Sequence, residues 1–160
     1  MSRGERPHFG MDSAAPDWDA IDFPAARATA ADPSTADLVA GDRTAGCALS
    51  LVADRATGWL VVVIAHPVTG ETFVPQVVNR HDHTRMRGSV DAAYGRGPRL
   101  HYALACAPGI RGLRARVPGG TWRVRLVAPS GWAAICLALE DVTLPLEVAV
   151  LEDDAWVELD

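Results

Sequence analysis

Apolar and polar positions alternate with a period of two along most of the chain after Thr44. This period is typical of β-strands, because successive side chains of a strand point to opposite faces. Turn signals separate the apolar runs at intervals of roughly 8–12 residues. The pattern predicts an all-β fold, either an antiparallel, jelly-roll-like β-sandwich or a small β-barrel, with about 8–10 strands. The expected strands lie in 45–54, 58–67, 72–78, 99–107, 113–117, 121–128, 132–140, 142–150 and 155–159.

Two of these runs are apolar at successive positions rather than at alternate ones. They are Trp59–Ala65 and Trp132–Leu139. A strand with this pattern is covered on both faces, so we expect both runs to be central strands.

The first 43 residues have a different composition. They are rich in Ala, Asp and Pro, with few β-branched residues. We interpret 1–43 as an N-terminal arm that is ordered only where it docks. It carries at most one short helix, expected at Ser34–Ala40 with Asp32 or Ser34 as the cap. Residues 44–160 then form a single β domain.

Composition places the protein among globular proteins of the cytoplasm. Apolar residues make up 49% of the chain and charged residues 22%, the N-terminus lacks the apolar segment of a secretory signal, and no run is long enough for a membrane span. The three cysteines lie in apolar runs and are expected to be free thiols. All 15 basic residues are arginine, which together with the high alanine content indicates a GC-rich bacterial genome.

The net charge of −5 conceals a strong division along the chain. Residues 79–125 contain ten arginines and two acids, whereas 126–160 contain eight acids and no base. The arginines concentrate in the predicted hairpin 113–126, around a turn at Pro118-Gly119. If the loop has two or four residues, the hairpin carries four arginines on one face. With two arginines from the preceding stretch, the candidate ligand-binding residues are Arg85, Arg87, Arg114, Arg116, Arg123 and Arg125.

Four like charges on one hairpin face require counter-charge. Three sources are open: the acidic C-terminal strands, through Glu147 or the acids 152–154; the acidic arm; or an anionic ligand or protein partner. We expect no nucleic acid partner, because the net charge is acidic and no nucleic-acid-binding motif is present.

The most polar stretch, 79–102, raises the question of a metal site. His81 and His83 stand two residues apart, so a strand would present both on the same side. Arginines at 85 and 87 follow, however, and cationic neighbours disfavour a bound metal cation. We therefore expect no metal and no other cofactor.

The same stretch offers groups for acid–base chemistry. Histidine titrates near neutrality, and Asp91 could orient His81 or His83 while Tyr94 contributes a hydroxyl. The alternative is a solvated loop without a chemical role, and we name no catalytic residue beyond these four candidates.

Two functions remain open. The first is a non-enzymatic β-sandwich module that binds a protein partner or a small anionic ligand through an arginine-rich face, and the lack of any nucleophile or cofactor motif favours it. The second is a small β-barrel enzyme of the cyclase or isomerase kind, with an apolar cavity and the arm as a lid, since such enzymes carry no sequence motif. The sequence contains no indication of oligomeric state.

Overall fold

The computed structural model describes residues 34, 36–44, 46–66, 72–79, 84–90, 99–139 and 146–159. In these ranges the chain forms eleven β-strands and no α-helix, which confirms the predicted all-β class. The strands are β1 (Ala36–Arg43), β2 (Ala48–Asp54), β3 (Trp59–Ala65), β4 (Thr72–Asn79), β5 (Thr84–Val90), β6 (Arg99–Cys106), β7 (Ile110–Arg116), β8 (Arg123–Leu126), β9 (Ala133–Leu139), β10 (Glu147–Glu152) and β11 (Ala155–Glu158).

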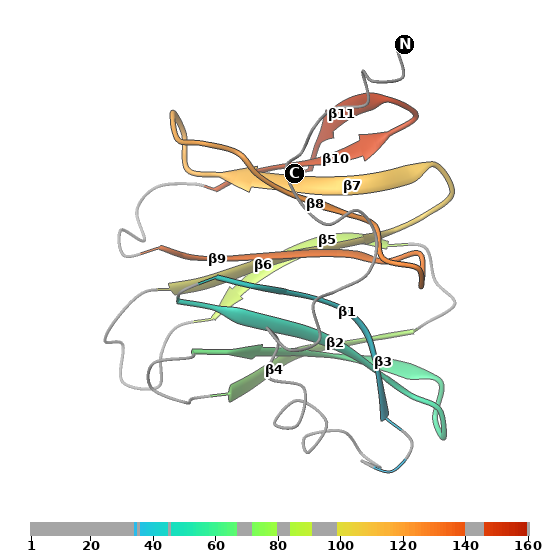
Figure 1. Cartoon of the computed structure of the whole chain (residues 1–160). Coiled ribbons are helices and arrows are strands. Elements are labelled where there is room, and N and C mark those ends of the chain that lie inside the picture. The colour runs from blue at the N-terminus through green and yellow to red at the C-terminus, as the bar shows by residue number, and fades with distance from the viewer. Residues whose placement is uncertain are drawn as a thin grey trace.

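The strands form three antiparallel sheets. Sheet A has the order β1-β2-β3-β4, sheet B the order β5-β6-β9, and sheet C the order β11-β10-β7-β8. Figure 1 shows them stacked as three layers, with sheet A at the bottom, sheet B in the middle and sheet C at the top. The protein is therefore a sandwich with one more layer than the usual two.

Strands β6 and β9 of sheet B are buried on both faces. Leu104 of β6 contributes to a core cluster shared with sheet A, whereas Ile135 of β9 contributes to a second cluster shared with sheet C. This explains the continuous apolar run at 132–139, and the expectation that this run forms a central strand is confirmed. The expectation for β3 is confirmed as well: Leu60 faces the first cluster, and Val63 on the opposite face is also buried.

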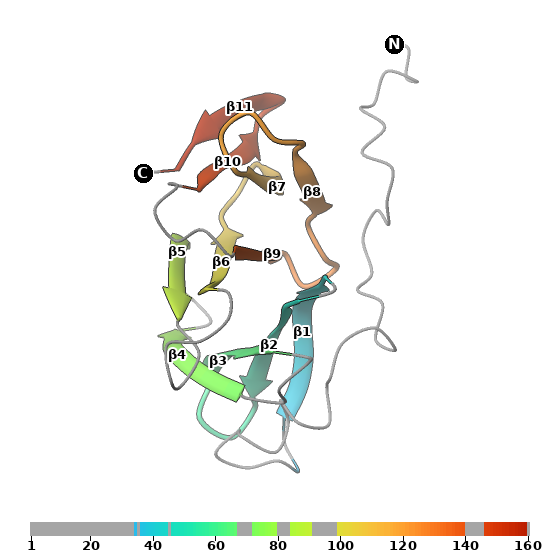
Figure 2. The same cartoon turned by 90° about the vertical axis from the view of Figure 1, so that its left-hand side faces the viewer.

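Sheets A and B approach each other at both of their edges. At one edge β4 lies beside β5, and at the other β1 lies beside β9 (Figure 2). The Tyr102 hydroxyl donates a hydrogen bond to Gln76 Oε1 and so links sheet B to β4. Burial raises the pKa of Tyr102, so the phenol stays protonated and remains a donor. Side-chain contacts at both edges give sheets A and B a barrel-like arrangement.

Gly88 makes the Tyr102 contact possible. A Cβ atom built on Gly88 would lie 2.6 Å from the Tyr102 hydroxyl oxygen, because the phenol ring crosses β5 directly above this glycine. We expect Gly88→Ala to lower the free energy of unfolding by about 2 kcal/mol, since the extra methyl must displace a buried ring. Chemical denaturation measures the effect, with Ser89→Ala as the neighbouring control. Equal stability of the two variants would contradict the close packing of Tyr102 on β5.

Two strands differ from the sequence prediction. The helix expected at Ser34–Ala40 is wrong: Ala36–Arg43 form β1, which pairs with β2 along its whole length apart from a bulge between Leu38 and Ala40. The β structure thus begins within the range assigned to the arm. The stretch 79–102, interpreted as a loop or a site, contains β5, in which exposed Arg85, Arg87 and Ser89 alternate with less exposed residues. The rest of the arm lies outside the described residues.

The described part of the chain contains no helix of the length and apolarity that a membrane span requires.

Candidate binding surface

The outer face of sheet C carries a stack of aromatic and cationic side chains. The Arg114 guanidinium carbon lies 4.0 Å from the ring centroid of Trp122 and 4.4 Å from that of Trp156. The guanidinium carbon of Arg116 lies 4.1 Å from the Trp122 centroid. These distances are those of cation–π contacts. We call Trp122, Arg114 and Trp156 the tryptophan–arginine stack.

Strand register brings the stack together. In β7 the inward Leu113 and Ala115 are buried, so Arg114 between them points outward. Arg114 lies opposite Ala149 of β10, whose small side chain leaves room for the guanidinium. Trp156 lies opposite Leu151 across the β10–β11 pair, and Leu151 is buried although it belongs to this outer face. The stack therefore covers apolar atoms while its own three side chains stay partly exposed.

The two arginines of this face differ in their partners. Arg116 Nε donates to Glu147 Oε1 at 2.7 Å. Among the described residues no oxygen accepts a hydrogen bond from Arg114, and its Nε atom is shielded from solvent. Burial, and after it the positive charge of Arg116, lower the pKa of Arg114, while Glu158 opposes this shift. Within the described part of the chain, the Arg114 cation therefore has unused hydrogen-bond donors.

The predicted face with four arginines is wrong. The register of β7 and β8 places Ala115 opposite Arg123 and Leu113 opposite Arg125, so the arginines of β8 share the inner face. The predicted turn is present, since Gly120 N bonds to Val117 O at 2.8 Å and Gly119 has a φ of +80°. The pairing of Ala115 with Arg123 leaves an odd number of residues between them, 116–122, whereas the predicted pairing requires an even number, so the register differs from the prediction by one position. A one-residue shift moves every side chain of a strand to the other face.

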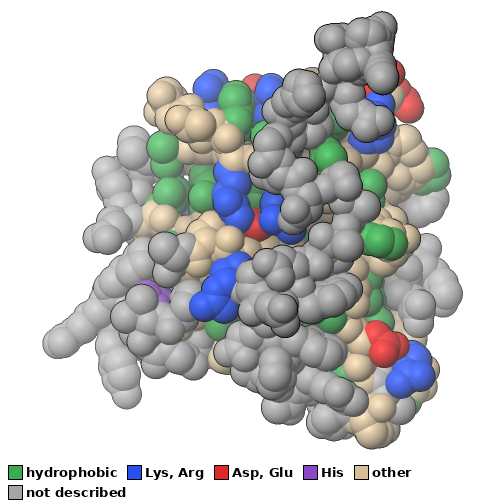
Figure 3. All heavy atoms as spheres, viewed as in Figure 1, with side chains coloured by type: hydrophobic (Ala, Val, Ile, Leu, Met, Phe, Trp, Pro, Cys, Tyr) green, Lys and Arg blue, Asp and Glu red, His purple; other side chains and the backbone are tan. Residues whose placement is uncertain are grey.

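Arg123 and Arg125 instead bind a buried carboxylate. Arg123 holds Asp42 of β1 with both Nε, at 3.0 Å, and a terminal nitrogen, and Arg125 Nε lies 3.5 Å from the same carboxylate. Burial disfavours the charge of Arg123, but the hydrogen bonds and negative charge of Asp42 prevail and raise the pKa of Arg123. Figure 3 shows basic side chains beside an acidic one near the middle of one molecular face.

Asp42 also joins two sheets. The backbone N–H of Cys136 in β9 donates to Asp42 Oδ2 at 2.9 Å, so a carboxylate replaces the neighbouring strand that this edge of sheet B lacks. The Cys136 thiol contacts the carbonyl oxygens of Asp42 and Cys47. Burial, and then the contact with Cys47, raise the pKa of Cys136 well above its ordinary value. This thiol is therefore protonated and structural rather than nucleophilic.

The two remaining candidate arginines contact sheet C. Arg85 forms an ion pair with Glu152, and Arg87 donates to the carbonyl oxygen of Leu146 at 2.8 Å. Together with Arg116–Glu147, these contacts confirm that the C-terminal strands supply counter-charge within the chain. Sequence reasoning missed the tryptophan–arginine stack and the role of Asp42, which lies in a segment interpreted as an arm.

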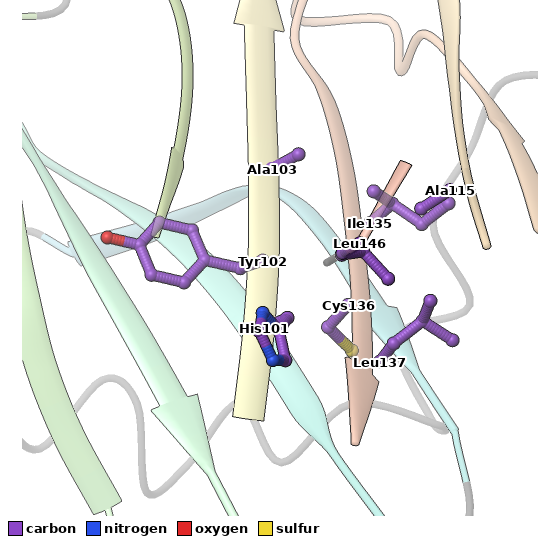
Figure 4. A pocket seen from close by; sticks show the side chains of 8 residues that line it. All are labelled: His101, Tyr102, Ala103, Ala115, Ile135, Cys136, Leu137 and Leu146. Atoms are coloured by element: carbon purple, nitrogen blue, oxygen red, sulfur yellow. The ribbon is translucent and has the colours of Figure 1, made fainter. Parts of the chain in front are cut away.

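The candidates for metal binding and acid–base chemistry lie outside the described residues; they are His81, His83, Asp91 and Tyr94. In the ranges that are described, no three His, Cys, Asp or Glu side chains gather as a metal site would require. His101 and Tyr102 of the same stretch point to opposite faces of β6 (Figure 4). The side chains of His101 and Tyr102 therefore do not form part of one common site.

A narrow recess lies between sheets B and C beside His101. Its walls include Ala103, Ile135 and Leu146, as Figure 4 shows. The recess is partly open to solvent, and the space between its walls is too narrow for a water molecule. A substrate cannot enter a recess of this size without movement of the surrounding strands.

A second exposed apolar feature lies at the edge of sheet A. Trp59, Val74 and Val77 are 46%, 45% and 54% exposed, and all three belong to β3 or β4. Val77 lies opposite Val61 on the outer face of the sheet. Pro75 removes one backbone donor from this edge strand, which hinders pairing with another strand.

Comparison of the chain with protein-family models, curated proteins and solved structures gives no match.

Proposed function

We propose that the protein is a non-enzymatic module that binds a protein partner through the outer face of sheet C. One observation carries the proposal: Arg114 is held between Trp122 and Trp156 on an exposed sheet face, and no oxygen among the described residues accepts its hydrogen bonds. This surface replaces the face of four arginines expected from the sequence.

The residue types of the stack support this role. Trp and Arg are the side chains most enriched among the residues that dominate the energy of protein interfaces. Two indole rings restrict the Arg114 guanidinium before any partner arrives, so less conformational entropy is lost on binding. The Arg116–Glu147 pair and the exposed Glu158 lie around the stack as a polar rim, which is the usual surrounding of such a centre.

The alternative is an enzyme of the cyclase or isomerase kind. Such an enzyme needs an enclosed cavity large enough for its substrate, and the recess beside His101 is too narrow to be that cavity. We further propose a cytoplasmic location, because Cys47, Cys106 and Cys136 are all free thiols.

Site-specific photo-crosslinking tests the proposed surface. A photoreactive amino acid at Val124, which lies opposite Arg114 on the outer face of sheet C, should capture a protein partner in cells of the source organism. The same group at the exposed Val77 of sheet A is the control. We expect the Val124 product to disappear when Trp122 and Trp156 are both replaced by Ala. A product that persists in that double variant, or no product from Val124, would contradict the proposal.

A further inference from the structure

Arg114 differs from the other five candidate arginines because no oxygen among the described residues accepts a hydrogen bond from it. Carboxylates or a carbonyl accept from four of the others: Glu152 from Arg85, Leu146 O from Arg87, Glu147 from Arg116, and Asp42 from Arg123. Arg125 forms an ion pair with Asp42. Within the described residues, Arg114 instead contacts the aromatic rings of Trp122 and Trp156.

Stacking uses the faces of a guanidinium and leaves its edge available. The five N–H donors of arginine lie in the plane of the group, whereas the ring centroids of Trp122 and Trp156 lie 4.0 and 4.4 Å from its central carbon. Trp122 directly precedes β8 and Trp156 belongs to β11, so the two rings come from opposite sides of β7 in the sheet. A group that satisfies these donors must approach in the plane. Because Nε of Arg114 is shielded from solvent, a carboxylate fits the edge formed by the two terminal nitrogens, with two parallel hydrogen bonds.

The nearby acids of the described strands leave this position open. Glu147 is engaged by Arg116. Glu158 stands in the same row as Arg114, but Ala149 of β10 lies between them. Two strand spacings amount to roughly 9–10 Å, and no ion pair joins Glu158 to Arg114 in the described part of the chain. Glu158 therefore acts on Arg114 only by the attraction between their charges, without a direct contact.

The surroundings of Arg114 also specify what must flank the carboxylate. Trp122 and Trp156 are partly exposed on either side of the guanidinium, and their ring surfaces favour apolar neighbours. We propose that the partner presents an acidic segment in which one carboxylate binds Arg114 and an adjacent apolar side chain packs on Trp122 or Trp156. This inference rests on the proposed function.

Titration of the full chain with a synthetic peptide tests this chemistry. The probe is a short peptide in which glutamates alternate with phenylalanines, and its counterpart has glutamine in place of each glutamate. The indole N–H resonances of Trp122 and Trp156 report binding at the site itself. We expect the acidic peptide to shift both resonances and to bind about tenfold or more tightly than the glutamine peptide, because charge-assisted hydrogen bonds are roughly twice as strong as neutral ones.

Variants assign the effect to Arg114. Arg114→Gln should remove the preference for the acidic peptide, and Arg114→Lys should not restore it, because an ammonium offers neither stacking nor a bidentate edge. Arg111→Gln is the matched control, since Arg111 lies in the same strand and pairs with Asp154 at an exposed position; it should change affinity less than twofold.

Equal binding of both peptides, or an Arg114→Gln variant that still prefers the acidic one, would overturn the carboxylate inference. Failure to shift either indole resonance would overturn it as well. These results are independent of the crosslinking from Val124. If Val124 captures a partner but the two peptides bind equally, the proposed surface is correct and the carboxylate inference is wrong. If the acidic peptide binds more tightly but no partner is captured, the carboxylate inference is supported and the proposed function is contradicted.

Discussion

The Asp42→Ala variant is expected to lose about 3 kcal/mol of its free energy of unfolding, because the buried Asp42 carboxylate binds Arg123, Arg125 and the Cys136 N–H. Breaking a buried ion pair by removing one partner costs roughly 3–5 kcal/mol. Arg123 and Arg125 retain some exposure, at 27% and 18% of their side chains, and can turn partly to solvent, which reduces that cost. The backbone N–H of Cys136 is buried and cannot turn to solvent, and an unsatisfied buried donor costs about 1–3 kcal/mol.

Asp37 is the matched control for Asp42. It lies in the same strand but pairs with Arg55 at an exposed position, where an ion pair contributes about 0–1 kcal/mol. Urea denaturation of Asp42→Ala and Asp37→Ala, followed by tryptophan fluorescence, gives the comparison. Equal midpoints would show that the carboxylate between β1 and β9 does not hold sheets A and B together.

Truncation of sheet B side chains is expected to destabilise the protein equally on both of its faces. Leu104→Ala removes atoms from the core shared with sheet A, and Ile135→Ala removes them from the core shared with sheet C. Both residues are fully buried, so each substitution should cost about 2–5 kcal/mol through lost burial and the cavity left behind. A two-layer sandwich would tolerate the change on its outer face.

Thermal unfolding monitored by circular dichroism checks this expectation. Val77→Ala, at an exposed position of sheet A, should stay within about 0.5 kcal/mol of the original chain. If Ile135→Ala behaved like Val77→Ala, sheet C would not be packed on sheet B in solution, and the three-layer arrangement would be wrong.

Local signals explain why nine of the strands could be predicted from the sequence. The turn between β2 and β3 is one example: Gly58 N bonds to Asp54 O at 2.8 Å, and Gly58 has a φ of +79°, a conformation suited to glycine. Likewise, the uninterrupted apolar run of β9 reflects burial on both faces. Information of this kind lies within a few residues of each strand.

The features that could not be predicted from the sequence depend on contacts with residues far away along the chain. β1 is rich in Ala and Asp and has weak strand propensity, but pairing with β2 determines its conformation. The polar alternation of β5 is that of an edge strand whose arginines meet β10 far along the chain. The register of β7 and β8 depends on a single residue of loop length. The site prediction therefore identified the arginines but not the faces on which they lie.

The position of β10 has a consequence for the way the chain is made. β10 lies between β7 and β11 in sheet C, and it begins at Glu147, after every strand of sheets A and B. A nascent chain emerges from its N-terminus, so β9 can pack against β7 before Val148 and Val150 of β10 join the core on this side of sheet B. Until they do, part of the apolar surface around Ile135 lacks its cover and is open to aggregation or to chaperones. Emergence of β10, rather than formation of the early hairpins, is therefore the step that ends this vulnerability.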